Sequence, residues 1–345
     1  MTEQNISLLA ESHTAYGKKS FYRHWLRVMR HAVIIDTDPR VLSALCRRLW
    51  QSLHSHVLWT LFQASHPELL SGVILPNERI AIVPRQKNGE THVTETDTIS
   101  HTLRIPDPHQ VYDDDDGQNA SSSVYRHLFI ANEYLKDLES LWASVQSLKR
   151  QIEAVEQDLI SSLCLSAPQW PTSTLEMYHA FHSSLTFHGP FSVATAVLPN
   201  IRRTLIASPP GSPVPAMLKR VALKAARMGH PVLLLHCGLD PSRIDHIYFP
   251  ELSWLVSHNL APHSRAPAPH DNVMDLTDGF GKELTNLSPK IEQFLSLYAH
   301  AYNQAWEDFS RLPDSSSPQD DPGDTEFWVQ EILNWQPFQK LIQSG

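Results

Sequence analysis

The chain has 345 residues, of which 41% are hydrophobic and nine are tryptophan, so it can bury the core of a globular protein. Its net charge of −9 excludes an extended nucleic-acid surface, which would need clustered Lys and Arg. Three scattered cysteines and the lack of any run of about 18 apolar residues predict a cytoplasmic protein with no disulfide framework and no membrane span. No Cys-x-x-Cys spacing occurs, so the sequence predicts no metal site.

Residues 1–123 are predicted to form a first α/β unit. Its expected elements are a strand at 32–35, a loop at 36–44, a helix at 41–53 and strands at 57–62 and 80–83. Lys18 and Lys19 are interpreted as part of a solvated turn. The unit ends in an acidic, serine-rich stretch at 107–123 whose four consecutive aspartates are typical of a solvated loop rather than of a cation site.

Residues 124–167 are predicted to be a long helical segment, since apolar side chains recur every three or four positions from Leu128 to Leu159. An unbroken helix would reach roughly 60 Å and could form a coiled-coil arm. A hairpin, or a helix lying on the body of the protein, satisfies the same pattern. The spacing alone does not decide between these arrangements.

Residues 168–312 are predicted to form a second α/β unit around a loop at 207–215. The short apolar strand Leu205-Ile206 leads into this loop, and a helix from about 216 to 228 follows and ends at Gly229. A strand at 232–235 then closes a βαβ unit, with the loop placed where phosphate-binding loops lie.

The end of the second unit and the rest of the chain are predicted to be helical, with one interruption. An amphipathic helix is expected at 282–312, a flexible linker at 313–324, and a C-terminal amphipathic helix within 325–345. We expect the helices at 124–163 and 326–342 to offer surfaces to a protein partner.

The two α/β units have the same order of predicted elements, which indicates an internal repeat. Residues match at an offset of 171 before the helix, 174 after it, and 171 again further downstream. The matched pairs are Pro39 with Pro210, Pro67 with Pro241, Pro76 with Pro250, and His92 with His263.

Neither loop carries the groups that bind a triphosphate. A working phosphate loop reads Gly-x-x-x-x-Gly-Lys-Ser/Thr, in which the lysine neutralises phosphate charge and the hydroxyl binds Mg²⁺. In the second loop Val214 takes the lysine position and Pro215 the hydroxyl position. In the first loop these positions hold Ser43 and Ala44.

The remaining motifs resemble a bacterial family of ATPase-like or nucleotide-binding proteins made of two tandem P-loop units. In that family each loop is followed by a strand ending in His-Cys, an Asp-Pro turn, a strand opened by Pro-Glu-Leu and an Ala-Pro-His segment. The second unit keeps Pro210-Gly211, His236-Cys237, Asp240-Pro241, Asp245, Pro250-Glu251-Leu252 and Ala261-Pro262-His263. The resemblance, which covers roughly residues 14 to 310, implies two P-loop NTPase-like units with parallel sheets, ATP with Mg²⁺ as cofactor, and ATP hydrolysis.

Several polar residues of the second unit are candidates for a site, because they are expected near the carboxyl ends of its strands. The candidate catalytic residues are Asp240, Asp245 and Glu251, and the candidate cofactor-binding residues are Pro210, Gly211, Ser212, His236 and His263. The plainer interpretation is that Asp240 caps a turn and that Glu251 pairs with an arginine such as Arg243. His236 and Cys237 are adjacent on a strand, so their side chains are expected on opposite faces and cannot form a nucleophile-base pair.

Two functions follow from this sequence. The first is a degenerate P-loop protein that acts as a scaffold or regulatory binding protein without catalysis. The alternative is a nucleotide-binding protein or weak ATPase in which the second loop holds a nucleotide with positive charge from Lys219, Arg220 or a partner. The missing lysine favours the first, because that charge supplies much of the stabilisation in phosphoryl transfer.

Overall fold

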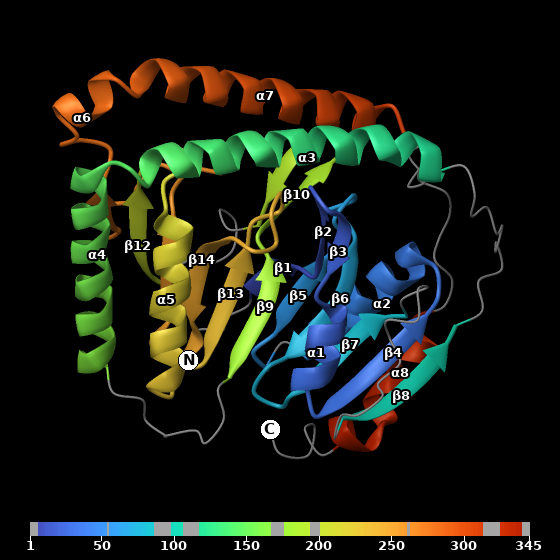
Figure 1. Cartoon of the computed structure of the whole chain (residues 1–345). Coiled ribbons are helices and arrows are strands. Elements are labelled where there is room, and N and C mark those ends of the chain that lie inside the picture. Colours follow the sequence, from blue (N-terminus) through green and yellow to red (C-terminus); the bar gives the residue numbers. More distant parts are fainter. Residues whose placement is uncertain are drawn as a thin grey trace.

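A twelve-stranded, mostly parallel sheet forms the centre of the protein, which is mixed α/β as predicted (Figure 1). The computed structural model describes residues 6–53, 55–85, 98–105, 117–166, 176–193, 201–260, 263–312 and 325–339. The strands, in the order in which they lie side by side, are β16 (Asn272–Asp275), β12 (Arg202–Ala207), β15 (Trp254–His258), β14 (Ile244–Phe249), β13 (Val232–His236), β9 (Met177–Phe181), β1 (Ile6–Leu9), β5 (Trp59–Phe62), β6 (Leu70–Leu75), β7 (Ile80–Pro84), β4 (His31–Asp36) and β8 (Ile99–Arg104).

The sheet consists of two halves that repeat one strand order. From the centre outward, the first half runs β1, β5, β6, β7, β4, β8, and the second runs β9, β13, β14, β15, β12, β16. The halves join where the carboxyl ends of β1 and β9 meet, with Leu9 opposite Phe181. The repeat that the proline spacing indicates is therefore visible in the topology, and both units belong to one sheet.

Local backbone features repeat together with the topology. Arg79 and Ser253, which are 174 positions apart, are the non-glycine residues of the described chain with positive φ, at 56° and 46°. Each ends the short turn that joins β6 to β7 or β14 to β15. The register also shifts at Leu61/Phe62 in the first half and at Leu235/His236 in the second, again 174 positions apart. Such irregularities re-aim side chains at the end of a strand.

The prediction of parallel sheets holds for most neighbouring strands of each half, but two strands are antiparallel. β6 and β14 run antiparallel to both of their neighbours. The cause is the length of the connections, because a turn of a few residues, such as 76–79, can join only antiparallel strands. The other neighbours within each half pair in parallel.

Two small hairpins follow the central strands and were not predicted. β2 (Glu11–Thr14) pairs with β3 (Gly17–Ser20), and β10 (Ser183–Thr186) pairs with β11 (Gly189–Ser192). Lys18 and Lys19, interpreted as part of a turn, lie on β3. Each hairpin is closed by a threonine hydroxyl that donates to a glycine carbonyl at 2.7 Å, from Thr14 to Gly17 and from Thr186 to Gly189.

The helices surround the sheet. They are α1 (Tyr22–Val28), α2 (Pro39–Ser52), α3 (Gly117–Trp142), α4 (Gln146–Leu165), α5 (Val214–Arg227), α6 (Lys282–Thr285), α7 (Ser288–Ser310) and α8 (Thr325–Asn334), with the 3-10 turn η1 at Pro250–Leu252. Residues 117–123, predicted as loop, begin α3. The predictions for Asp113–Asp116, for His92 and for the 313–324 linker fall outside the described residues, as does the end of the helix predicted at 326–342.

The long helical segment is broken, so the protein has no 60 Å arm there. α3 ends at Trp142, whose indole N–H donates to the carbonyl of Pro210 at 2.8 Å. α4 then begins at Gln146, whose backbone N–H donates to the carboxylate of Glu283 at 2.7 Å. A carboxylate at a helix N-terminus satisfies free N–H groups and the helix dipole. Tertiary contacts at both ends of residues 143–145 thus fix the break.

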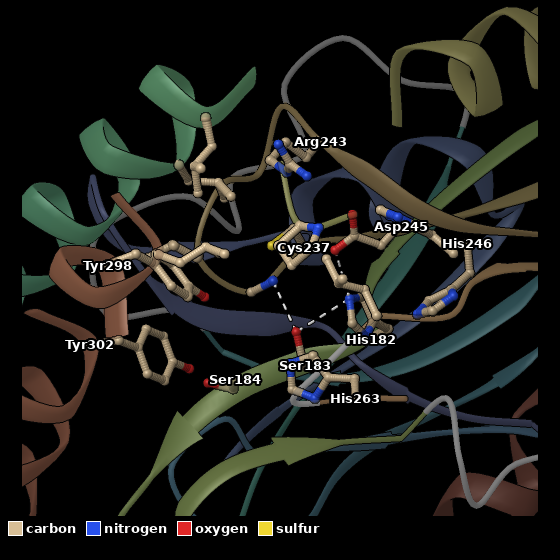
Figure 2. A pocket seen from close by; sticks show the side chains of 18 residues that line it. His182, Ser183, Ser184, Cys237, Arg243, Asp245, His246, His263, Tyr298 and Tyr302 are labelled. Carbon is tan, nitrogen blue, oxygen red and sulfur yellow. Dashed lines mark hydrogen bonds and ion pairs between the residues drawn. The ribbon is translucent and has the colours of Figure 1, made fainter. Parts of the chain in front are cut away.

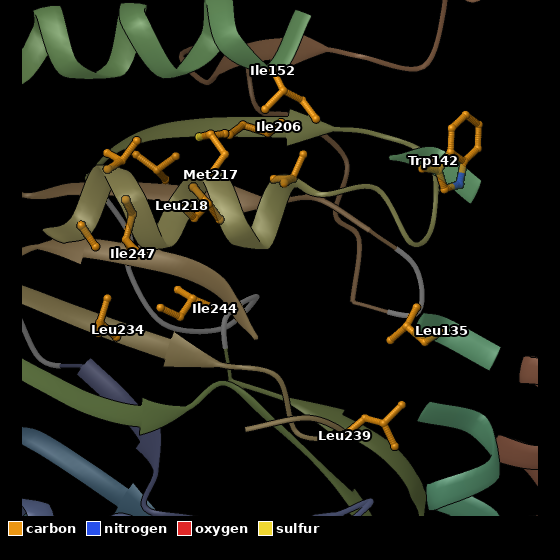
Figure 3. Packing of buried hydrophobic residues seen from close by; sticks show 14 of the residues in the cluster. Leu135, Trp142, Ile152, Ile206, Met217, Leu218, Leu234, Leu239, Ile244 and Ile247 are labelled. Atoms are coloured by element: carbon orange, nitrogen blue, oxygen red, sulfur yellow. The ribbon is translucent and has the colours of Figure 1, made fainter. Parts of the chain in front are cut away.

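The helices that follow each half cover the other half. α4, which follows the first half, packs on α5 of the second, where Ile152 lies above Met217 and Ile206 (Figure 3). α8, which follows the second half, packs on α2 of the first. α3 and α7 pack along each other over the hairpins at the edge of the sheet (Figure 1). This exchange ties the halves together and buries the apolar stripes of the helices predicted to bind a partner.

Candidate functional site

A pocket lies at the edge of the second half, beneath α3 and α7 (Figure 2). Its empty space, including the mouth open to solvent, is about 750 Å³. The carboxyl ends of β9, β12, β13 and β15 and the start of antiparallel β14 meet here, which is where open α/β sheets bind ligands. Its polar lining consists of His182, Ser183, Ser184, Cys237, Arg243, Asp245, His246, His258, His263, Tyr298 and Tyr302.

The loop at 207–215 lies beside this pocket and is covered by α3. Gly211 has a φ of +79°, and a Cβ built on it would lie 2.5 Å from the Cβ and 3.2 Å from the backbone carbon of Leu138. The glycine therefore serves close packing of α3 against the loop. Trp142 fastens the same helix through its bond to the Pro210 carbonyl. α3 therefore leaves no room for a side chain at position 211 of the loop.

The polar groups of the loop are paired with one another. Ser208 Oγ lies 2.6 Å from Ser212 Oγ and 2.7 Å from His258 Nε2, and the N–H of Ser212 donates to the carbonyl of Pro209 at 3.0 Å. Ser208, Ser212 and His258 are all buried, and burial lowers the pKa of His258 to about 4. The ring is therefore neutral at neutral pH and supplies no positive charge for an anion.

The loop at 36–44 is closed in a different way. The side chain of Asp38 is the N-cap of α2 and accepts from the N–H of Arg40 at 2.8 Å. Asp36 pairs with Arg85 at 2.9 Å and with Arg104 at 3.1 Å. Carboxylates thus occupy the helix N-terminus that would otherwise attract phosphate, and they would repel a polyphosphate.

Asp245 is held by His182, a residue that the sequence analysis did not select. His182 Nε2 donates to Asp245 Oδ2 at 3.1 Å. Burial raises the pKa of Asp245, but the bond from His182 and the charge of Arg243 outweigh burial and leave the pKa well below its usual range. The predicted site residue is therefore a stable carboxylate within the pocket. His182 follows directly after the strand at 177–181, and this position at the carboxyl end of a strand is the signal that would have identified it.

The Ser183, His182 and Asp245 side chains do not form a catalytic triad. Ser183 Oγ lies 3.4 Å from His182 Nε2, the same nitrogen that binds Asp245. A triad needs the serine and the carboxylate on different nitrogens of the ring. The Ser183 hydroxyl instead accepts from the N–H of Gly238 at 3.0 Å. This geometry favours a structural role for the serine.

His236 and Cys237 lie on opposite faces of the sheet, as predicted. Cys237 lines the pocket, while His236 Nε2 lies 2.8 Å from His179 Nδ1 and its Nδ1 donates to the Pro241 carbonyl at 2.6 Å. Burial, with the charge of Asp245, raises the pKa of the Cys237 thiol well above its usual range. A protonated thiol is a weak nucleophile, so the pair supports no cysteine hydrolase. His236 is not part of the pocket.

Two other candidates, Asp240 and Glu251, also lie outside the pocket lining. Asp240 caps its own turn by accepting from the N–H and hydroxyl of Ser242 at 2.8 and 2.7 Å. Glu251 is exposed on η1, which joins β14 to β15 at the edge away from Asp245, because β14 runs antiparallel. The expected pairing of Glu251 with Arg243 is wrong, since Arg243 pairs with Glu139 of α3.

His263, the last candidate, lies in the pocket beside His182, with ring centroids 5.2 Å apart. Burial lowers its pKa to about 3, so the ring is neutral at neutral pH. Its neighbour His246, on β14, is also buried, and burial lowers its pKa well below the usual range. The pocket therefore brings together Pro210, Asp245 and His263 from the predicted set, with Gly211 and Ser212 in the adjoining loop.

The described residues contain no group of three or more His, Cys, Asp or Glu side chains that could hold a metal ion. Among the described helices, none is long and apolar enough to cross a membrane. Comparisons with protein-family models, curated proteins and solved structures found no match for the chain. What can be said of its function therefore depends on the geometry of the loops and the pocket.

Proposed function

We propose that this protein is a degenerate member of the P-loop type that binds partners or ligands without hydrolysing nucleotides. The observation that supports the proposal is the close packing of α3 against Gly211, where a Cβ would meet the Cβ and the backbone of Leu138. A strand, a loop and a helix in the order of a phosphate-binding unit support the P-loop relationship.

The charges near the second loop support the same proposal. The lysine position is held by Val214, which is fully buried. Arg220, which was considered as a substitute, is paired with Glu156 through bonds of 3.0 and 3.1 Å to its Nε. Phosphoryl transfer needs fixed positive charge beside the transferred group. Of the two side chains considered as substitutes for the loop lysine, only Lys219, an exposed residue on α5, remains.

A protein partner stays part of the proposal, with a different surface. The apolar stripes of α3, α4 and α8 are buried within the chain. The outer faces of these helices keep exposed aromatic residues, Phe129 on α3 and Phe327 on α8. A partner would therefore contact the outer faces of these helices. A cytoplasmic location of the protein stays a prediction.

The alternative, a nucleotide-binding protein or weak ATPase, is tested by isothermal titration calorimetry with MgATP and MgGTP. We expect no saturable binding up to about 1 mM nucleotide, because the loop is covered and uncharged. A dissociation constant below about 10 μM for the wild type would overturn the proposal. Two variants would locate such binding. If Gly211→Ala loses nucleotide binding and Gly17→Ala retains it, the nucleotide binds at the second loop.

A further inference from the structure

The pocket beneath α3 and α7 contains buried polar atoms that have no partner in the protein. Asp245 Oδ1 and His246 Nε2 are both buried without a hydrogen bond. His246 is 2% exposed, and its other nitrogen lies 2.8 Å from Ser257 Oγ. Native proteins rarely leave buried polar atoms unpaired, so each such atom needs an explanation. Both side chains line one cavity, and a ligand in that cavity would explain both atoms (Figure 2).

The charges around the cavity disfavour an anion as that ligand, because two carboxylates, Glu139 and Asp245, stand against one cation, Arg243. Arg243 is paired with Glu139, although its Nε is buried without a hydrogen bond, and burial keeps His246 and His263 neutral at neutral pH. Asp245 remains ionised, and its free oxygen can only accept a hydrogen bond. The group that faces Asp245 must therefore be a donor, and a positive charge on it would be favourable in this buried place.

The opposite wall of the cavity is apolar and aromatic. Tyr298 and Tyr302 of α7 stack with ring centroids 6.0 Å apart, and Leu138 and Leu295 lie beside them. Burial raises the pKa of both phenols, so they stay neutral. Such a wall suits a flat apolar body, and aromatic faces also attract cations.

The first half has no ionisable side chain at the positions of Asp245 and His246. Ser71 stands at the position of Asp245 and Gly72 at that of His246, each 174 residues earlier. A Cβ on Gly72 would lie 2.6 Å from the carbonyl oxygen of Ile82. At the neighbouring hairpin His13 is satisfied on both nitrogens, by Tyr125 at 3.0 Å and Ser65 at 2.8 Å. At the position of Asp245 the first half thus has the hydroxyl of Ser71, which is also buried without a hydrogen bond, and the unpaired carboxylate is a feature of the second half.

We propose that this pocket is a binding site for a small organic cation, an amidinium or ammonium group on a flat apolar body, held by Asp245 Oδ1. His246 Nε2 contacts the same polar end, and Tyr298 and Tyr302 contact the apolar end. The inference concerns the pocket and does not depend on whether the adjoining loop binds a nucleotide.

Three compounds of one shape test this site: benzamidine as the cation, benzamide as the neutral donor and benzoate as the anion. By ligand-observed NMR and calorimetry on the full chain, we expect benzamidine to bind at least about tenfold more tightly than benzamide, and benzoate not to saturate at about 10 mM. Benzoate binding as tightly as benzamidine, or no binding by any of the three, would overturn the proposal. This comparison needs no variant.

A pair of charge-removing variants then locates the site. Asp245→Asn should weaken benzamidine binding at least about tenfold and leave benzamide within about threefold, whereas Asp158→Asn, on an exposed part of α4, should change neither. Thermal unfolding of each variant shows whether it is folded. If folded Asp245→Asn binds benzamidine as the wild type does, the site is not at Asp245 and the inference is wrong.

Discussion

Gly211→Ala is the most direct perturbation of the contact between α3 and the second loop. The added Cβ would meet the Cβ of Leu138 at 2.5 Å, its carbonyl carbon at 3.2 Å and the backbone nitrogen of Glu139 at 3.3 Å. Two of these three atoms are helix backbone, so rotation of a side chain cannot relieve the overlap. The helix must move, or the loop must.

The size of the effect can be estimated from two separate costs. Placing alanine at a φ of +79° costs about 1–2 kcal/mol relative to glycine. Overpacking of a filled interior adds about 1–3 kcal/mol. We therefore expect Gly211→Ala to lower the free energy of unfolding by about 2–5 kcal/mol, measured by urea denaturation with tryptophan fluorescence.

Gly17→Ala provides the matched control. Gly17 also has a positive φ, of 88°, but a Cβ on it would meet nothing within 4 Å. Only the conformational cost of about 1–2 kcal/mol should appear there. If the two variants lose equal stability, α3 is not seated on Gly211 in solution, and the main support for a closed loop is removed.

Three further predictions concern groups around the same half. Trp142→Phe should lower the free energy of unfolding by about 1 kcal/mol in urea, because a loop carbonyl loses its donor. Cys237 should react with iodoacetamide much more slowly than exposed Cys164 in a mass-spectrometric time course, because burial raises its pKa; equal rates would contradict this. His236 and His258 have pKa values lowered by burial to about 3 and about 4, so between those values and about 6.5 the unfolded chain binds more protons than the folded one. Stability should therefore fall with acidification below about pH 6.5, by up to about 1.4 kcal/mol per pH unit for each ring, and replacing either ring by Asn should flatten the urea-midpoint curve.

The spacing of apolar side chains was sufficient to predict those helices and strands in which this spacing is regular. The helix after the second loop, expected at about 216–228, is α5 (Val214–Arg227), and the strand expected at 232–235 is β13. The opposite orientation of His236 and Cys237 also follows from strand alternation. The repeat offset located equivalent positions in the two halves correctly, because it depends on matched landmarks and not on knowledge of the fold.

The structural features that the sequence did not predict depend on contacts between segments that are distant in sequence. In hairpin β2–β3, the first strand consists of four buried polar residues, Glu11–Thr14, and pairs with a second short strand. Such a segment has no apolar alternation to detect. The break after Trp142 depends on Glu283 and Pro210, which are far away in sequence. His182 became part of the site only because β9 and β14 flank the same strand, β13. Pattern within one segment carries no information about these neighbours.

The two halves close their loops by unrelated means, as we expect if the proposed degenerate phosphate site is right. In the first half a carboxylate, Asp38, caps α2 and repels an anion at the helix N-terminus. In the second half α3 packs closely against Gly211. A single closing element shared by both loops could be a regulatory cover that opens for a nucleotide. Two independent closures, each built into the packing of its own half, are what we expect when neither loop needs to open, and the cavity at Asp245 is a place where the second half has room for a ligand.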